Sequence, residues 1–390
     1  MSKYLMENAG PGYQFARFSG ADPYRDFPVS LEEWREAAKK VVPRDAWDYL
    51  EGGAGSESTL NSNIESFSKW RLRPRYLRDV SRRSLSVSLL GRVEPTPFVL
   101  APMGALSVIH ADAEIAAARA AGKSGIPFVL STVSSHSIEK VATQAPETEK
   151  WFQLYPAKDM EIVKSMIRRA ESSGYRVLVV TVDTFLLGWR VRDLRNSYLP
   201  FLKGAGLANY LTDQVFLSQL KRPPEEDMMG AISRFLSVYV NPQFTWSHLK
   251  QILEFTKLPV VLKGITHPQD VKLAIQAGVS GIVVSNHGGR QLDGAVSTID
   301  ALSQITEAPP PRTELLLDGG IRHACDAMKA IALGARAVMI GRPYAYALAV
   351  GGERGVEAFL SQLLAEFDLE LGLSGFSSPS EINRECVTRV

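Results

Sequence analysis

Eight short apolar segments recur along this chain, and a stretch with helical periodicity follows most of them. They span residues 98–103, 127–132, 151–155, 177–183, 259–264, 281–286, 314–319 and 337–342, with helical patterns at 111–124, 160–173, 268–276 and 324–333. The segments are continuously apolar, which is typical of strands buried on both faces of a parallel sheet. Eight such units predict an α/β protein with a closed (β/α)8 barrel, the TIM barrel. A doubly wound open sheet is the alternative; it is disfavoured because no Gly-x-Gly-x-x-Gly turn follows the first segment, although that fold does not strictly require one.

The interval between the fourth and fifth segments, residues 184–258, is far longer than one crossover helix needs. It mixes aromatic residues and glycines with a charged, proline-containing run at 222–227, and it predicts an insertion above the barrel mouth. A lid over the site, with Tyr210 as the candidate lid residue, and a surface excursion without a role are equally open interpretations.

Three other parts complete the expected organisation. Residues 1–97 predict a helical segment that contributes to the site, with its clearest helices at 31–41 and 45–51. The barrel domain is expected over 98–371, and the amphipathic stretch 355–371 should pack outside the barrel. Residues 372–390 form a C-terminal tail.

Composition excludes several classes of protein. The 390 residues are 45% hydrophobic, which suits one large or two medium globular domains. Lysine plus arginine (44) nearly balances aspartate plus glutamate (42), so neither a nucleic-acid surface nor a membrane surface is expected. Without a signal-peptide pattern or an apolar run of membrane-spanning length, we expect a soluble, cytoplasmic protein. Cys325 and Cys386 lie far apart and outside metal-ligand spacing, so neither a disulfide framework nor a metal site is expected.

Polar residues gather where the apolar segments end, and the active sites of such barrels lie at that face. The run Ser285 to Gln291 places a histidine, which takes up a proton near neutral pH, three residues before an arginine, which can hold a carboxylate through two hydrogen bonds. The pair suits an anionic substrate that loses a proton, whereas a lone His-Gly-Gly is more often a core histidine beside a turn.

Glycines and arginines at 319–322 and 341–342 follow the last two segments, from which such barrels commonly bind a phosphate. Lys263 would neutralise charge on the anchored ligand, and a salt-bridged core lysine is the equal alternative.

Six segments together resemble one family. The stretches SNHGGRQLDG (285–294), TVDT (181–184), FQLY (152–155), LKG (262–264), DGGIR (318–322) and IGRP (340–343) are similar to the FMN-dependent L-2-hydroxy acid oxidising family, whose members include glycolate oxidase and lactate oxidase. The match runs in order from about residue 30 to residue 371. The stretches LGWRVRDL (187–194) and NYLTD (209–213) and the long insertion most resemble its lactate 2-monooxygenase branch.

The resemblance implies the reaction and its catalytic residues. The cofactor would be FMN, the substrate a small L-2-hydroxy acid, above all L-lactate, the acceptor oxygen, and the assembly a homotetramer or homo-octamer. His287 would remove a substrate proton, and Asp183 would hydrogen-bond the imidazole and stabilise its charged form. The substrate would be bound by Tyr49, Tyr155, Arg190 and Arg290.

The cofactor site implied by the resemblance spans most of the strand ends. Lys263 would face the flavin edge where negative charge develops on reduction, Asp318 would bind the ribityl hydroxyls, and the arginines after the last two strands would bind the phosphate. The complete set is Ala101, Pro102, Met103, Gly104, Ser131, Gln153, Thr181, Lys263, Ser285, Asp318, Gly319, Gly320, Arg322, Gly341 and Arg342.

Two departures from the family pattern bear on the products. Thr132-Val133 stands where several family oxidases carry an aromatic residue, which implies a pocket wall of different size. Gly104 stands where those oxidases commonly have alanine, and lactate 2-monooxygenases resemble it in having glycine. If pyruvate stays bound while oxygen reacts, peroxide decarboxylates it to acetate; if pyruvate leaves first, peroxide is released. An ordinary backbone adjustment is the alternative interpretation of Gly104.

Other functions remain as alternatives. An L-lactate oxidase that gives pyruvate and hydrogen peroxide, or a dehydrogenase with another electron acceptor, would use the same residues. A flavin barrel resembling isopentenyl diphosphate isomerase or an IMP dehydrogenase-like barrel is more remote, and the latter needs a loop cysteine, whereas Cys325 falls in a helical pattern. A catalytically silent ligand-binding barrel is disfavoured by the intact set of His287, Arg290, Asp183 and Lys263.

Overall fold

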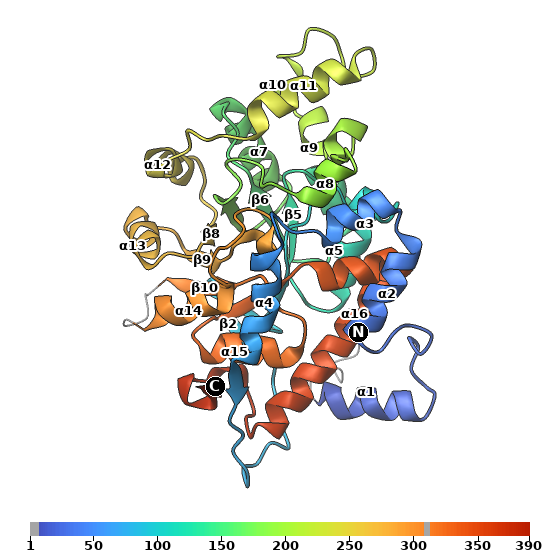
Figure 1. The fold of residues 1–390 in the computed structure, drawn as a ribbon, viewed down its shortest axis with the longest axis vertical. Helices are drawn as coiled ribbons and strands as arrows, with labels where there is room; N and C mark the ends of the chain where they lie inside the picture. Colours follow the sequence, from blue (N-terminus) through green and yellow to red (C-terminus); the bar gives the residue numbers. More distant parts are fainter. Residues whose placement is uncertain (1–7, 308–312) are drawn as a thin grey trace.

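A closed barrel of eight parallel strands forms the centre of the protein, as the sequence predicts (Figure 1). The computed structural model describes residues 8–307 and 313–390. The strands follow one another around the barrel in chain order, and the last pairs with the first through Val338 opposite Phe98. They are β4 (Phe98–Leu100), β5 (Phe128–Ser131), β6 (Lys150–Leu154), β7 (Leu178–Thr181), β8 (Val260–Ile265), β9 (Gly281–Val284), β10 (Glu314–Leu317) and β11 (Ala337–Ile340). An open doubly wound sheet is therefore excluded.

Helices cover the outside of the barrel. They are α5 (Ala113–Lys123), α6 (Ile138–Gln144), α7 (Met160–Ser172), α12 (Trp246–Phe255), α13 (Pro268–Ala277), α14 (Thr298–Thr306), α15 (Ala324–Ala332) and α16 (Arg342–Leu373). Helix α7 shows why these segments are helical: the Asp159 side chain caps its first turn, and its apolar residues recur at helical spacing on the buried face. The stretch expected at 355–371 is the second half of α16, beyond a kink at Gly351 and Gly352. Outside the barrel, α16 packs against α5, α15 and two helices of the N-terminal segment, α1 (Ala9–Phe18) and α2 (Leu31–Val41).

Alternation along the strands separates two apolar clusters. One cluster fills the barrel and includes Val99, Val129 and Val261, whereas their neighbours in sequence, such as Phe98 and Phe128, pack against the helices. Because side chains of a strand alternate between its faces, every second residue continues the inward row. At the carboxyl ends of the strands this inward row reaches Ser131, Gln153, Thr181, Lys263, Ser285 and Asp318. The sequence thus places a polar layer on top of an apolar barrel interior.

The N-terminal segment contains strands as well as the predicted helices. Its elements are α1 (Ala9–Phe18), α2 (Leu31–Val41), α3 (Arg44–Glu51), α4 (Ser58–Ser68), β1 (Trp70–Leu72), β2 (Val87–Leu89) and β3 (Arg92–Glu94). The β2–β3 hairpin brings Val87 and Leu89 into the interior cluster, so it closes the amino end of the barrel. The C-terminal tail holds η5 (Pro379–Glu381), η6 (Arg384–Cys386) and β12 (Val387–Arg389), and β12 pairs with β1.

The insertion after β7 forms short helices at one end of the molecule, drawn in green and yellow in Figure 1. They are α8 (Val191–Arg195), η3 (Pro200–Lys203), α9 (Ala208–Leu211), α10 (Gln214–Leu217) and α11 (Met228–Tyr239). Helix α12 contacts α7 and α13 and thus takes the place of a barrel helix, so the extra chain ends before Trp246. Within the described part of the chain, no helix combines the length and apolarity needed to cross a membrane.

Candidate active site

A pocket opens at the carboxyl ends of the barrel strands. It contains about 1150 Å³ of space not filled by protein atoms, part of it open to solvent, which is enough for a cofactor and a small substrate together. Most of the predicted site residues line it: Tyr49, Ala101, Pro102, Met103, Gly104, Tyr155, Arg190, Lys263, His287, Arg290, Asp318, Gly319, Gly320, Arg322, Gly341 and Arg342. The structure therefore brings residues from the N-terminal segment, the insertion and six strand ends to one cavity.

His287 and Asp183 form a hydrogen-bonded pair at this pocket. The imidazole Nδ1 lies 2.7 Å from Asp183 Oδ1, and the Thr184 hydroxyl, which donates to the same carboxylate oxygen, lies 3.1 Å from Nδ1. The carboxylate places the ring proton on Nδ1, so Nε2 keeps a lone pair, 3.5 Å from the Tyr155 hydroxyl. His287 has a φ of 58°, a left-handed conformation uncommon for a residue with a side chain. Asp183 lies behind the histidine instead of lining the pocket.

The protonation states of this pair suit a general base. Burial favours the neutral imidazole and lowers the pKa of His287, although the Asp183 carboxylate acts in the opposite direction. For Asp183, burial disfavours the charge, but His287 and Lys263 outweigh that effect and keep its pKa below the ordinary value. At neutral pH a charged carboxylate thus orients a neutral imidazole that can accept a proton.

Two arginines give the pocket an unbalanced positive charge. Arg290 Nη1 donates to the carbonyl oxygens of Tyr49 and Gly52, at 2.5 Å and 2.9 Å, and its Cζ lies 4.9 Å from the centre of the Tyr49 ring. Arg190 Nε donates to the carbonyl oxygen of Arg290. Burial, together with the neighbouring Arg190, lowers the pKa of Arg290, because the cation has no carboxylate in contact among the described residues. An anion bound here would stabilise both charges.

Lys263 lies in the polar layer beneath the pocket. Its Nζ contacts Asp318 Oδ2 at 2.9 Å and donates to Ser285 Oγ at 3.0 Å. Burial disfavours the ammonium charge, but Asp318 and Asp183 outweigh burial and raise the pKa of Lys263. The lysine is thus a fixed cation at the floor of the pocket.

The remaining polar residues of this layer bond to one another. Ser131 Oγ donates to Gln153 Oε1 at 3.1 Å, and Gln153 Nε2 donates to Thr181 Oγ1 at 3.0 Å. Ser131, Gln153, Thr181 and Ser285 are buried and do not line the pocket wall, yet they continue the inward row of the barrel. Their side chains belong to the polar layer beneath the pocket.

A second positive region follows β10 and β11. Gly320 has a φ of 94°, and a Cβ there would lie 2.0 Å from the Asn63 carbonyl oxygen, so only glycine lets α4 cross at this point. Arg342 begins α16 and donates to the carbonyl oxygens of Leu50, Gly52 and Gly288. The amino end of a helix together with a partly buried guanidinium attracts an anion.

Other residues at the site were not predicted from the sequence. Tyr239 of α11 and Phe201 of η3 line the pocket, and the Tyr239 ring lies 5.4 Å from the Tyr155 ring. Asn63 of α4 exchanges two amide hydrogen bonds of 2.8 Å with Asn286, next to His287. For Tyr239 and Phe201, the only signal in the sequence was the length of the insertion that contains them. The sequence analysis chose Tyr210 of that insertion as the lid candidate instead. Tyr210 is fully buried against Phe216 and Phe235 and does not reach the pocket.

The barrel and its pocket define a class of oxidoreductase, and comparisons with known proteins identify the family. The model of the FMN-dependent dehydrogenase family matches residues 38–389. A protein named L-lactate oxidase from Lysinibacillus sphaericus (strain C3-41) is 42% identical, with 90% of each chain covered. The 2-hydroxyacid oxidase 1 of Homo sapiens is 39% identical, with 93% of this chain and 96% of that protein covered. A crystal structure of mandelate oxidase matches with a TM-score of 0.82 at 36% identity and covers 93% of this chain and 98% of that one.

The chain belongs to the FMN-dependent dehydrogenase family and is an FMN-dependent 2-hydroxy acid oxidoreductase. The residues present fit FMN. Asp318 Oδ1 is buried without a hydrogen-bond partner among the described residues, as expected for an acceptor that awaits a ligand hydroxyl. Lys263 supplies a cation at the floor of the pocket, and Arg322 and Arg342 supply positive charge where a phosphate would bind.

Proposed function

We propose that the protein oxidises a small L-2-hydroxy acid, most of all L-lactate, and uses oxygen as the electron acceptor. The observation that carries the proposal is the neutral His287, oriented by Asp183, in one pocket with the unbalanced Arg190 and Arg290. This arrangement matches a substrate that has a carboxylate to bind and a proton to lose. Leu187, Phe201 and Tyr239 add apolar bulk from the insertion, which favours a small side chain on the substrate.

Each residue has a defined task in this proposal. Arg190 and Arg290 bind the carboxylate, and the Tyr49 and Tyr155 rings confine the substrate beside His287. His287 accepts the substrate proton at Nε2, and Asp183 stabilises the imidazolium that results. Bound FMN supplies the two-electron acceptor for the substrate. Lys263 stabilises the negative charge that develops at the floor of the pocket as electrons arrive.

We further propose the lactate 2-monooxygenase outcome, in which L-lactate and oxygen give acetate, carbon dioxide and water. Its support is the close packing at Gly104: a Cβ there would lie 2.5 Å from Val133 Cγ2, so glycine and valine share the wall that an alanine would crowd. Because both residues line the pocket, this wall sets the space beside the substrate. Release of pyruvate and hydrogen peroxide is the second candidate, and the 42% identity to proteins named L-lactate oxidase favours it.

Two measurements on FMN-loaded protein test these proposals. L-lactate added without oxygen should bleach the flavin absorbance, whereas D-lactate should not. If no small L-2-hydroxy acid bleaches the flavin, the proposed reaction is refuted. Aerobic turnover should then yield acetate and carbon dioxide in equal amounts. Pyruvate with peroxide as the main products would establish the oxidase outcome instead.

His287→Ala provides the residue-level test. The variant should keep FMN, because the residues that fit the cofactor lie elsewhere, but flavin reduction should slow by about a thousandfold or more. Stopped-flow absorbance under anaerobic conditions measures the rate. Near-normal reduction would exclude His287 as the base. The homotetramer or homo-octamer and the cytoplasmic location stay predictions.

A further inference from the structure

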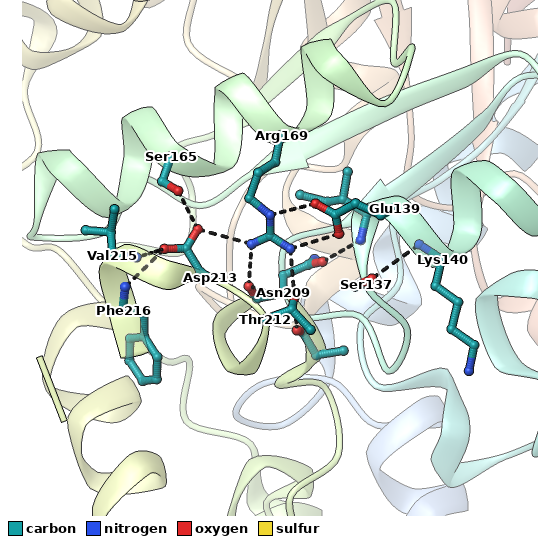
Figure 2. A network of polar contacts seen from close by, with 12 residues as sticks. Ser137, Glu139, Lys140, Ser165, Arg169, Asn209, Thr212, Asp213, Val215 and Phe216 are labelled. Atoms are coloured by element: carbon teal, nitrogen blue, oxygen red, sulfur yellow. Dashed lines mark hydrogen bonds and ion pairs between the residues drawn. The ribbon is translucent and has the colours of Figure 1, made fainter. Parts of the chain in front are cut away.

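The stretch Asn209 to Asp213 in the insertion does not line the pocket, although it was singled out in the sequence. Asn209, Thr212 and Asp213 instead take part in a polar network that joins the insertion to the barrel helices α6 and α7 (Figure 2). Asn209 and Asp213 are both fully buried. Burial of such polar groups is costly unless every partner is in place, so this network is built to hold one geometry.

The outer half of the network is centred on Arg169 of α7, and all five of its N–H donors have acceptors. Nε and Nη2 donate to the two Glu139 oxygens at 2.8 Å and 3.0 Å, and Nη2 also donates to Thr212 Oγ1 at 2.7 Å. Nη1 donates to the Asn209 carbonyl oxygen at 2.7 Å and to Asp213 Oδ2 at 3.1 Å. Arg169 therefore fixes the backbone of α9 to the barrel.

Asp213 completes this outer half. Its Oδ1 accepts from the backbone N–H groups of Val215 and Phe216, both at 3.0 Å, and so caps α10. Its Oδ2 accepts from Ser165 Oγ on α7 at 2.7 Å. The carboxylate thus ties α10 to α7, and the Arg169 Nη1 that it accepts from also holds the Asn209 carbonyl oxygen.

The inner half of the network is the Asn209 side chain, which points toward the barrel. Its Nδ2 faces three oxygens: the Ser131 carbonyl at 3.2 Å, the Thr132 carbonyl at 3.0 Å and Ser134 Oγ at 3.1 Å. Its Oδ1 accepts from the Ile138 N–H at 2.9 Å, at the start of α6. One amide therefore links residues 131–134, the end of β5 and the loop after it, to the next helix.

The segment 131–134 in turn positions the pocket. Val133 lines the cavity, and its carbonyl oxygen accepts from the Ala105 N–H at 2.8 Å, one residue beyond Gly104. Thr132 Oγ1 accepts from the Tyr155 N–H at 2.9 Å and donates to the Gln153 carbonyl oxygen at 2.6 Å. A displacement of this segment would therefore shift the Val133 wall and the backbone of β6 and Tyr155 together.

We propose that Asn209 is a positioning residue for the reaction. Its amide fixes segment 131–134, and the Arg169–Asp213 pair fixes Asn209, so Asn209 sets the width of the pocket beside Gly104 without lining the pocket itself. The effect on catalytic rates rests on the proposed function, whereas the effect on segment 131–134 does not. Through Asn209, the insertion would then affect the pocket wall at Val133, in addition to the residues of the insertion that line the pocket directly.

Asn209→Asp tests the proposal by replacing one heavy atom, the amide nitrogen, with an oxygen. The variant keeps an oxygen for the Ile138 N–H, but it places an acceptor against the Ser131 and Thr132 carbonyl oxygens. In FMN-free protein, hydrogen exchange of backbone amides in 104–107 and 131–138 should rise by about tenfold or more, the effect expected when buried groups lose a hydrogen-bond partner. Exchange in β8 and β9 should stay unchanged. Asn209→Ser, which is too short to link the segment to α6 but carries no charge, should show the same local pattern.

Ser165→Ala is the matched control, because it removes one hydrogen bond from the outer half, whereas Arg169 still holds both Asp213 and the Asn209 carbonyl oxygen and the Asn209 amide stays in place. Its exchange in 131–138 should match the parent protein. With FMN bound, Asn209→Asp should also shift the flavin absorption spectrum and slow anaerobic reduction by about tenfold or more at saturating substrate. Ser165→Ala should change neither.

Three results would overturn the proposal: unchanged exchange in 131–138 in both Asn209 variants, exchange raised equally throughout the barrel, or the same local pattern in Ser165→Ala. A parent protein that no L-2-hydroxy acid reduces would refute the proposed function alone. The exchange experiment would still decide whether Asn209 positions the segment, because it needs neither substrate nor cofactor.

Discussion

Gly104→Ala probes the packing on which the product outcome depends. The added methyl carbon would lie 2.5 Å from Val133 Cγ2, 2.9 Å from the Val133 carbonyl oxygen and 3.5 Å from Ser131 Oγ. The first two distances are too short, so one side must move. Valine has few alternative rotamers, and its carbonyl oxygen is held by the Ala105 N–H at 2.8 Å. The methyl is therefore expected to push the Val133 segment and to stretch this hydrogen bond.

The size of the effect follows from overpacking. Inserting a methyl group into a packed site costs about 1 to 3 kcal/mol. With an unfolding entropy of about 2.1 cal/mol/K per residue, a chain of this length would lose only roughly 1 to 4 °C in Tm. The Tm is therefore an insensitive measure, and the ratio of acetate to pyruvate after aerobic turnover of L-lactate is the better one. We expect that ratio to fall, because the pocket wall moves where pyruvate and oxygen must both fit, while reduction by lactate changes less.

Val133→Ala separates packing from other causes. It removes the closer of the two contacts but leaves the carbonyl oxygen, so the double variant should recover part of the lost stability and part of the acetate yield. The two changes should couple by about 0.5 kcal/mol or more, as contacting residues do. Additive effects, or an acetate ratio that Gly104→Ala leaves unchanged, would refute a role for this contact.

The remaining predictions concern charge. Arg290→Lys keeps the positive charge but loses the planar fork, so substrate affinity and flavin reduction should both weaken in rapid-mixing experiments, and parent-like values would show that Arg290 does not bind the carboxylate. Because burial lowers the pKa of His287 from 6.5, the neutral base should persist at and above pH 6.5, and kcat/KM should fall only at more acidic pH. Asp183→Asn removes a group that raises this pKa, so the acidic limb should move to still lower pH while the maximum rate drops; an upward move would contradict the assignment. Arg342→Met should weaken FMN binding in a fluorescence titration, and unaltered affinity would place the phosphate elsewhere.

The sequence by itself determined the eight strands and most of the pocket residues and predicted the barrel, and the structure then excluded the alternative of an open doubly wound sheet. Continuous apolar strands of residues such as Val, Ile and Leu, separated by helical intervals, fit only a sheet buried on both faces, and all eight strands were found where the pattern placed them. In a parallel barrel every strand ends at the same face, so polar residues after each strand, such as Lys263, His287 and Asp318, had to meet. The positions of these residues at the strand ends therefore predicted which side chains form the site.

The sequence pattern could not predict contacts between segments that are far apart in the chain. The β2–β3 hairpin that closes the barrel and the β1–β12 pair form only because the folded barrel brings their partners together. The insertion showed its length but not its geometry, since its short helices are held by tertiary bonds and not by their own periodicity. An exposed lid tyrosine and a buried one look alike in sequence, and only packing against Phe216 and Phe235 decides the position of Tyr210.

Directions of side chains also needed the tertiary structure. Gly104 was notable from sequence, but the structure alone shows that a methyl there points at Val133. Asn209 gave no signal of its role, because its partners at 131–138 and 169 come from three other elements. Local pattern fixes which face of a strand or helix a residue occupies, since that depends on backbone periodicity. Which groups then meet across elements depends on packing in three dimensions. The position of the pocket wall at Val133 therefore followed only from the tertiary structure.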